Sequence, residues 1–316
     1  MIISQTPLRV SFLGGGTDLP IYTDKYIGQV ISTTIDKFVY ALVTKRTDNL
    51  IYVGYTVQEV VHSIDKIQHD LVRECARICD MYNGFEVKTW ADIPSSGSGL
   101  GSSSSVTVGL LNAFHAFKGE YASPKQLAEE ACKVEIEILG NPIGRQDQYA
   151  AAFGGYNHIK FFPSGKVTVK KIGEIGLGKY TLIPTGISRS SSTVLKKQQS
   201  LYTGNEYAYQ QLSKLVDEYF TSREFPNLIL PSLVMKDWDI KKALVDYPLA
   251  VEILIDKVVD AGATSYKLLG AGGGGHILAY SEKPDDFHFQ LICKGIEYLP
   301  FTFEPFGSKI IFNYRR

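Results

Sequence analysis

The sequence predicts an α+β protein built from two domains. Its 316 residues are 44% hydrophobic, which is enough to bury two substantial cores. Strand-like alternation dominates the chain up to about residue 60, whereas strands and helices are mixed beyond about residue 178. We therefore expect residues 1–177 to form the first domain and residues 178–316 the second.

The expected elements of the first domain follow from the spacing of apolar residues. Alternation predicts strands over 8–13, 30–35, 38–45, 50–53, 85–91, 156–161 and 166–172. Helical spacing from 64 to 82 includes Cys75 and Cys79, which we interpret as small core residues and not as disulfide or zinc ligands. A further helix follows residue 105. Ser123 can cap another helix, which ends near Leu139.

The second domain is expected to begin with a strand over 180–184. Helices are predicted over 190–201, 206–220 and 239–261, and a strand over 277–280. Another helix and a final strand complete this half of the chain.

Charge and hydropathy exclude several classes of partner. Lys plus Arg equals Asp plus Glu, 33 each, so no global field favours nucleic acid or an anionic membrane. No apolar run approaches the roughly 18 residues of a membrane span, and the N-terminus lacks a signal-peptide pattern. Local basic clusters are still compatible with this balance. The cysteines are interpreted as small core residues, so we expect a reducing, cytoplasmic setting.

Residues 94–105 carry the most informative local pattern, PSSGSGLGSSSS. Composition alone would suggest a flexible linker. However, a strand pattern precedes this stretch and a helical pattern follows it, so the glycines and serines lead directly into a helix start. Unpaired amides at such a start attract anions, and glycines let the backbone approach a ligand. We favour a phosphate-binding loop.

Two other glycine-rich stretches resemble nucleotide motifs but lack the required context. Residues 173–180 nearly spell a P-loop, yet Tyr180 stands where Ser or Thr is needed and a strand pattern follows. Residues 270–275 match the spacing of a dinucleotide fingerprint, but a strand follows them in place of a helix. A tight structural turn and a ligand contact both remain open for this second stretch.

Two carboxylates and one arginine are candidate site residues. Glu135 falls on the apolar stripe of its helix, so its carboxylate must be paired, protonated or bound to a cation. A buried salt bridge and a metal site are equally compatible with that position. Asp147 lies in a polar cluster that enters an apolar stretch, where a helix cap is the alternative. Arg9 lies on a strand that leads into three glycines, Thr17 and Asp18; an ordinary strand-edge arginine is the alternative.

The order and type of these motifs resemble the GHMP kinases, which phosphorylate sugars and mevalonate without a Walker loop. The three matching segments are TPLRVSFLGGGTD (6–18), IPSSGSGLGSS (93–103) and KLLGAGGGG (267–275). Together they span nearly the whole chain. The resemblance implies an N-terminal domain of ribosomal-protein-S5-like type, a ferredoxin-like C-terminal domain and an active site between them. His276 departs from the phenylalanine that is usual after the third motif.

The resemblance also implies roles for individual residues. It implies that ATP phosphates bind at Ser96, Gly97, Ser98, Gly99, Gly101, Ser102 and Ser103. Ser103 and Glu135 match the positions that hold Mg²⁺. Asp147 matches the catalytic aspartate, and Arg9 the basic residue that neutralises charge during transfer. The acceptor would contact Gly15, Gly16, Thr17, Asp18 and Gly273.

Within the family, the segments GGGTD (14–18), QDQYAAAFGG (146–155) and TGISR (185–189) most resemble D-glycero-D-manno-heptose 7-phosphate kinases, although fucokinase-type enzymes carry similar segments. Arg189 and three serines lie at an expected helix start, which suits a second phosphate. A capping cluster with a solvated arginine is the alternative there. We therefore expect transfer from ATP to the anomeric hydroxyl of a sugar phosphate. A free-sugar kinase of fucose or galactose type and a non-catalytic sugar sensor are the alternatives.

Overall fold

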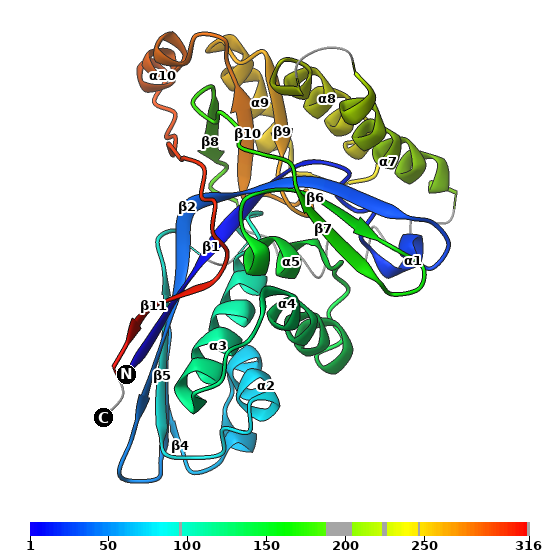
Figure 1. The fold of residues 1–316 in the computed structure, drawn as a ribbon. Coiled ribbons are helices and arrows are strands. Elements are labelled where there is room, and N and C mark those ends of the chain that lie inside the picture. The colour runs from blue at the N-terminus through cyan, green and yellow to red at the C-terminus, as the bar shows by residue number, and fades with distance from the viewer. Residues whose placement is uncertain (95–96, 188–203, 223–225, 246, 315–316) are drawn as a thin grey trace.

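A computed structural model describes residues 1–94, 97–187, 204–222, 226–245 and 247–314. Two layered units stand one above the other in Figure 1. The lower unit is an eight-stranded sheet with helices on one face, and the upper unit is a three-stranded sheet with helices beside it. This architecture confirms the predicted α+β class.

The larger sheet has the strand order β11-β1-β2-β5-β3-β4, and β6 and β7 extend it from β2. Its strands are β1 (Ile2–Leu13), β2 (Gly28–Lys45), β3 (Ile51–Gly54), β4 (Gln58–Val61), β5 (Phe85–Ala91), β6 (Tyr156–Phe161), β7 (Val167–Lys171) and β11 (Lys309–Asn313). Because β11 pairs antiparallel with β1, the end of the chain returns to the sheet of the first half. One strand therefore crosses the predicted domain boundary between residues 177 and 178, because β11 belongs to the second half of the sequence and to the sheet of the first.

Helices cover one face of this sheet and enclose the first core. They are α2 (Asp70–Ile78), α3 (Ser102–Lys118), α4 (Pro124–Cys132) and α5 (Gln146–Phe153), with a 3₁₀ turn over Ile64–Lys66. The short α1 (Pro20–Thr23) packs elsewhere, because its Tyr22 lies in a small cluster with Tyr209 and Leu212 of the second half. Cys75 and Cys79 are fully buried in that core and unbridged, as predicted. The predicted helix over 64–82 is shorter and interrupted, because residues 67–69 leave the helical conformation.

The smaller sheet has the order β8-β10-β9, formed by β8 (Tyr180–Pro184), β10 (His276–Tyr280) and β9 (Ser265–Leu268). The helices α7 (Glu206–Thr221), α8 (Pro226–Lys241), α9 (Leu249–Asp260) and α10 (Pro284–Cys293) accompany it. The single helix predicted over 239–261 is wrong, because the chain leaves the helix after Lys241 and re-enters it after Pro248. The helix predicted over 190–201 lies outside the described residues.

A second core joins the two units. Val10 and Phe12 of β1 pack in one buried cluster with Val216 of α7, Leu233 of α8 and Leu278 of β10. Burial at this junction stabilises the relative position of β1 and α8. The described site residues of the two halves are therefore joined through one buried cluster. Among the described residues, no helix is both long enough and apolar enough to cross a membrane.

Candidate active site

The serine-glycine stretch connects β5 to α3. Gly97, Gly99 and Gly101 have φ angles of +66°, +74° and +75°, a backbone region that favours glycine. The Ser98 and Ser102 hydroxyl oxygens lie 2.6 Å apart, and Ser98 Oγ accepts a hydrogen bond from Leu100 N at 3.2 Å. The loop thus leads directly into the free amides of the first turn of α3, as a phosphate loop requires. Ser96 lies outside the described residues.

The glycine loop between β9 and β10 packs against this loop. A Cβ on Gly99 would lie 2.8 Å from the Leu269 carbonyl oxygen, and a Cβ on Gly275 would lie 2.5 Å from the Ser98 carbonyl oxygen. His276 Nδ1 lies 2.8 Å from that same Ser98 oxygen, at hydrogen-bonding distance. The glycine-rich stretch over 270–275 therefore makes a close backbone contact between the two halves of the chain. Gly273 is buried within it.

Arg9 and Asp147 meet beside the phosphate loop. Arg9 Nε and Nη2 each donate to a different oxygen of Asp147, both at 2.8 Å, and Nη1 donates to the Gly99 carbonyl oxygen at 2.6 Å. The Arg9 side chain is buried, whereas Asp147 keeps about a quarter of its side-chain surface exposed. A Cβ on Gly101 would lie 3.2–3.4 Å from both side chains, so the loop passes directly over the pair.

Glu135 is completely buried, as its place on the apolar stripe predicts. It lies on a π-helical segment, η2 (Lys133–Ile138), that continues α4. Ser103 Oγ donates to one carboxylate oxygen at 2.8 Å and Gln148 Nε2 to the other at 2.7 Å. Burial raises the pKa of Glu135, and these hydrogen bonds lower it in part. No described Lys, Arg or His lies within ion-pair distance, so the salt-bridge alternative has no described partner.

The oxygen atoms around Glu135 are of the type that a hard cation takes. Gln148 Oε1, close by, is buried with no hydrogen-bond partner. The described chain holds no group of three or more His, Cys, Asp or Glu side chains able to bind a metal alone. Mg²⁺ in phosphoryl-transfer sites takes only one or two protein ligands and completes its shell with substrate phosphates and water. Ser103 and Glu135 fit that arrangement.

Asp18 lies at the end of the first glycine motif and contacts the start of α5. Its carboxylate accepts hydrogen bonds from Gly16 N at 3.1 Å, Gln146 N at 3.1 Å and Gln146 Nε2 at 3.3 Å. Burial raises the pKa of Asp18, and Asp147 also raises it. A Cβ on Gly144 would lie only 1.9 Å from Asp18 Oδ2, so this glycine makes room for the carboxylate.

The remaining predicted acceptor residues differ in how they are oriented. A Cβ on Gly15 would lie 4.0 Å from Gln146 Nε2, the group that donates to Asp18. The Thr17 side chain is fully buried, and its hydroxyl donates to the Gly14 carbonyl oxygen at 2.8 Å, so it is turned into the loop. Arg189 lies outside the described residues.

Sequence reasoning missed four polar side chains at this site. Gln146 and Gln148 flank Asp147 and contact Asp18 and Glu135 respectively. The sequence signal was present, because both belong to the same polar cluster as Asp147. His276 and Lys241 reach the site from the second half of the chain. No local pattern marks either of them as a site residue.

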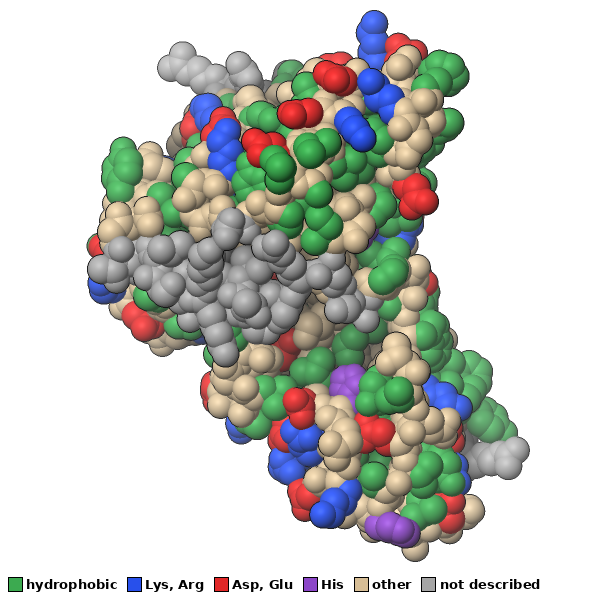
Figure 2. Space-filling model, turned by 180° about the vertical axis from the view of Figure 1, so that it is seen from behind, with side chains coloured by type: hydrophobic (Ala, Val, Ile, Leu, Met, Phe, Trp, Pro, Cys, Tyr) green, Lys and Arg blue, Asp and Glu red, His purple; other side chains and the backbone are tan. Residues whose placement is uncertain are grey.

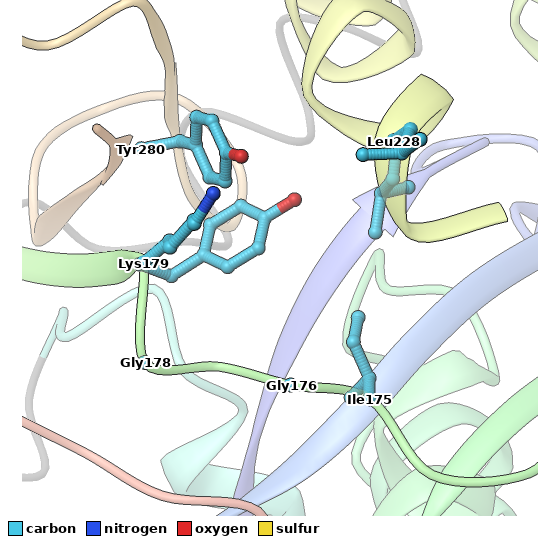
Figure 3. A pocket seen from close by; sticks show the side chains of 8 residues that line it. Ile175, Gly176, Gly178, Lys179, Leu228 and Tyr280 are labelled. Carbon is cyan, nitrogen blue, oxygen red and sulfur yellow. The ribbon is translucent and has the colours of Figure 1, made fainter. Parts of the chain in front are cut away.

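A separate cavity of about 300 Å³ lies away from these residues. It lies between the segment before β8 and the start of α8, where Tyr280 and Lys179 face Leu228 and Ile175 (Figure 3). None of the predicted site residues lines it. On the face seen in Figure 2, acidic and basic side chains are interspersed, in keeping with the equal numbers of each.

The glycine-serine loop at the start of α3 and the Arg9–Asp147 pair beside it have the arrangement expected of a phosphoryl-transfer enzyme without a Walker loop. The model of the GHMP kinases N terminal domain matches residues 62–155. The chain is 30% identical over 308 residues to a D-glycero-alpha-D-manno-heptose 7-phosphate kinase from Campylobacter jejuni, covering 88% of this chain and 89% of that protein. The chain therefore belongs to the GHMP kinase family, and it is an ATP-dependent small-molecule kinase.

Two further comparisons agree with this family. A galactokinase from Pyrococcus furiosus is 25% identical, with 89% of each chain covered. The crystal structure of a D-glycero-D-manno-heptose 1-phosphate kinase from Bacteroides thetaiotaomicron superposes with a TM-score of 0.79, covers 100% of both chains and is 23% identical. At that identity the superposition shows the fold alone, and it supports the two-domain α+β fold.

Proposed function

We propose that this chain phosphorylates the anomeric hydroxyl of D-glycero-D-manno-heptose 7-phosphate, with ATP as donor and the 1,7-bisphosphate as product. The Arg9–Asp147 pair beside a glycine-serine loop carries the transfer step of this proposal. The name of the Campylobacter jejuni relative, a heptose 7-phosphate kinase, supports the acceptor. Residues 1–177 would supply the ATP-binding half, with β11 added to its sheet.

In the proposed reaction, the ATP phosphates bind the loop over 96–103 and the start of α3. The anomeric oxygen attacks the γ-phosphorus, the bond from that phosphorus to the β–γ bridging oxygen breaks, and ADP leaves. Asp147 accepts the hydroxyl proton, because its carboxylate oxygens have lone pairs beyond those that Arg9 uses. Arg9 provides positive charge next to the transferred group.

Two further groups would position the substrates. Asp18, held by Gly16 and Gln146, would accept hydrogen bonds from sugar hydroxyls. Ser103 and Glu135 would hold Mg²⁺, which neutralises phosphate charge when bound. Arg189 is proposed as a phosphate-binding residue for the acceptor on its sequence context alone. Replacing it, as Arg189→Ala, should raise the KM for the sugar phosphate roughly ten- to a hundredfold and leave the KM for ATP unchanged.

The test is ADP release by the wild-type enzyme with Mg²⁺ across a panel of acceptors. The panel contains heptose 7-phosphate, hexose 6-phosphates, free heptose, mannose, fucose and galactose. The proposal predicts that kcat/KM is highest for heptose 7-phosphate, and above the unphosphorylated sugars by about ten- to a hundredfold, because a charged contact adds about 1.5–3 kcal/mol. A higher value for fucose or galactose would instead establish the free-sugar alternative, which the 25% identity to a galactokinase supports.

A further inference from the structure

Lys241, the last residue of α8, is a buried cation that has no counter-ion in the described part of the chain. Its side chain is 8% exposed, and its ammonium donates to the Gly270 carbonyl oxygen at 2.9 Å. Among the described residues this is its single hydrogen bond, and no carboxylate oxygen lies within ion-pair distance of it. A buried ammonium with one neutral partner is costly, because desolvation is then not offset by an opposite charge.

Asp237, a buried acid one turn earlier on α8, does not form an ion pair with Lys241. One oxygen of Asp237 accepts from Lys267 Nζ at 2.5 Å, and the other accepts from Gly14 N at 2.8 Å. Lys267 also donates to the Phe12 carbonyl oxygen at 2.8 Å. Asp237 is therefore satisfied by Lys267 and the first glycine motif, so Lys241 contributes an additional positive charge.

The ammonium of Lys241 faces the acceptor side of the site. A Cβ on Gly15 would lie 3.4 Å from Lys241 Nζ, 3.5 Å from Ser11 Oγ and 4.0 Å from Gln146 Nε2. Gln146 in turn holds Asp18, the proposed sugar-binding carboxylate. A methyl group at Gly15 would therefore be in ordinary contact with these polar atoms, so Lys241, Ser11 and Gln146 converge on the backbone at Gly15. The phosphate-loop serines are not part of this group.

The electrostatic surroundings favour an anion beside Lys241. Burial, and after it the nearby Lys267, lower the pKa of Lys241 to about 8, and Arg9 acts in the same direction. Asp237 and Asp18 oppose this shift. An anion placed against the ammonium would favour its charged form, so binding should take up a proton at about pH 8.

We propose that Lys241 binds the phosphate group of the acceptor beside Gly15. A phosphate fits this position better than a neutral hydroxyl, since only an anion compensates the buried charge, and lysine binds phosphate as a point charge. This inference rests on the proposed function and adds to it a specificity residue from the second half of the chain.

The test compares Lys241→Gln with Lys241→Arg and with Lys242→Gln. Lys242 is the matched control, because it is the next residue, is about half exposed and pairs with Asp239 at 2.6 Å. Calorimetric titration with heptose 7-phosphate, without ATP, gives the acceptor Kd, and steady-state assays give both KM values. We expect Lys241→Gln to raise the acceptor Kd at least about tenfold, with the KM for ATP changed less than about twofold. Lys241→Arg should restore most of the affinity, and Lys242→Gln should match wild type.

A pH series adds a readout that a structural role would not give. Wild-type affinity for the sugar phosphate should fall between pH 7 and pH 9 as Lys241 loses its proton, and the affinity of Lys241→Gln should not. An unchanged acceptor Kd with a lower kcat or a raised KM for ATP would assign Lys241 to the transferred phosphoryl group and overturn the proposal. Equal increases in the KM for the acceptor and the KM for ATP, with a lower Tm in Lys241→Arg as well, would show that Lys241 only stabilises the loop at Gly270. That result would also overturn the proposal.

The acceptor panel separates failure of this inference from failure of the proposed function. If another sugar phosphate is preferred over heptose 7-phosphate and Lys241→Gln weakens it, the heptose assignment fails and the role of Lys241 holds. If the preferred acceptor carries no phosphate, the role of Lys241 fails with it. If heptose 7-phosphate is preferred and Lys241→Gln binds it normally, only the role of Lys241 fails.

Discussion

Arg9 and Asp147, 138 positions apart in the chain, form a two-point ion pair in which both nitrogen–oxygen distances are 2.8 Å. β1 carries the arginine and the first turn of α5 carries the aspartate. The third guanidinium nitrogen donates to the Gly99 carbonyl oxygen at 2.6 Å. One buried side chain thereby fixes the position of the proposed base relative to the phosphate loop.

Asp147→Asn should lower kcat at least about a hundredfold, because the amide keeps the shape of the side chain and loses its basicity. The KM for ATP should change little, since the phosphate loop is intact. Steady-state kinetics check this, with Asp239→Asn on the exposed side of α8 as the control. Near wild-type turnover in Asp147→Asn would remove Asp147 from the catalytic role.

Glu135→Gln separates a metal ligand from a structural acid. Because burial already disfavours the charged carboxylate, a neutral amide should leave the Tm nearly unchanged. If Glu135 holds Mg²⁺, the half-saturating Mg²⁺ concentration for activity should rise at least about fivefold, about 1 kcal/mol. Magnesium titration beside a melting curve measures both quantities. An unchanged magnesium response with a loss of several degrees in Tm would contradict the metal role.

Gly99→Ala should disrupt the contact between the two glycine loops. The new Cβ would meet the Leu269 carbonyl oxygen at 2.8 Å and would force alanine to adopt a φ of +74°. We expect the KM for ATP to rise at least about tenfold, because the loop must shift away from its phosphate-binding geometry. Gly165→Ala is the matched control, since Gly165 has a φ of +81° and open space around it. Equal effects in the two variants would attribute the change to backbone strain alone.

The His115 ring links α3 to α4 and should make stability depend on pH. His115 Nε2 lies 2.8 Å from Glu130 Oε2, and Nδ1 lies 2.9 Å from Glu120 Oε2. Hydrogen bonding to Cys79, and then to Glu130, raises the pKa of His115 to about 11. A raised pKa stabilises the fold fully below the unfolded value of about 6.5, and this contribution is lost as pH rises toward 11.

His115→Gln should therefore lower the free energy of unfolding by about 1–3 kcal/mol at pH 6, and by progressively less as the pH is raised to 10. Urea unfolding of both proteins at several pH values measures this difference. His62 is exposed, so His62→Gln is the control, and its free energy of unfolding should equal that of the wild type at every pH. A difference that stays constant from pH 6 to pH 10 would show that the imidazolium charge contributes nothing.

The residues that sequence could predict are those with a local signal. The glycines and serines of 94–105 stand between a strand pattern and a helix pattern, and the stripe position of Glu135 predicts its burial. Lys241 and His276 have no such signal, because each becomes a site residue only where α8 or β10 packs against the first half. The pairing of β11 with β1 is likewise a long-range contact that no local pattern encodes.

The predicted helix boundaries in the second half were also wrong because of long-range packing. Residues 239–261 carry continuous apolar spacing, yet Leu244 packs with Tyr209 and Leu212 in a separate small core after α8 has ended. Pro248 then starts α9. Tertiary packing of Leu244 thus ends the helix although the apolar spacing of the sequence continues. The break sets where Lys241 lies, at the end of its helix.

³¹P NMR of the reaction mixture shows whether phosphate is transferred to the anomeric position of heptose 7-phosphate. With ATP, Mg²⁺ and heptose 7-phosphate, the account predicts a new anomeric phosphate signal that grows in step with ADP, while the 7-phosphate signal persists. The same mixture with Asp147→Asn should give a rate at least about a hundredfold lower. Formation of ADP without an anomeric phosphate signal, or rapid phosphorylation of free galactose or fucose in place of the heptose phosphate, would contradict the proposed transfer.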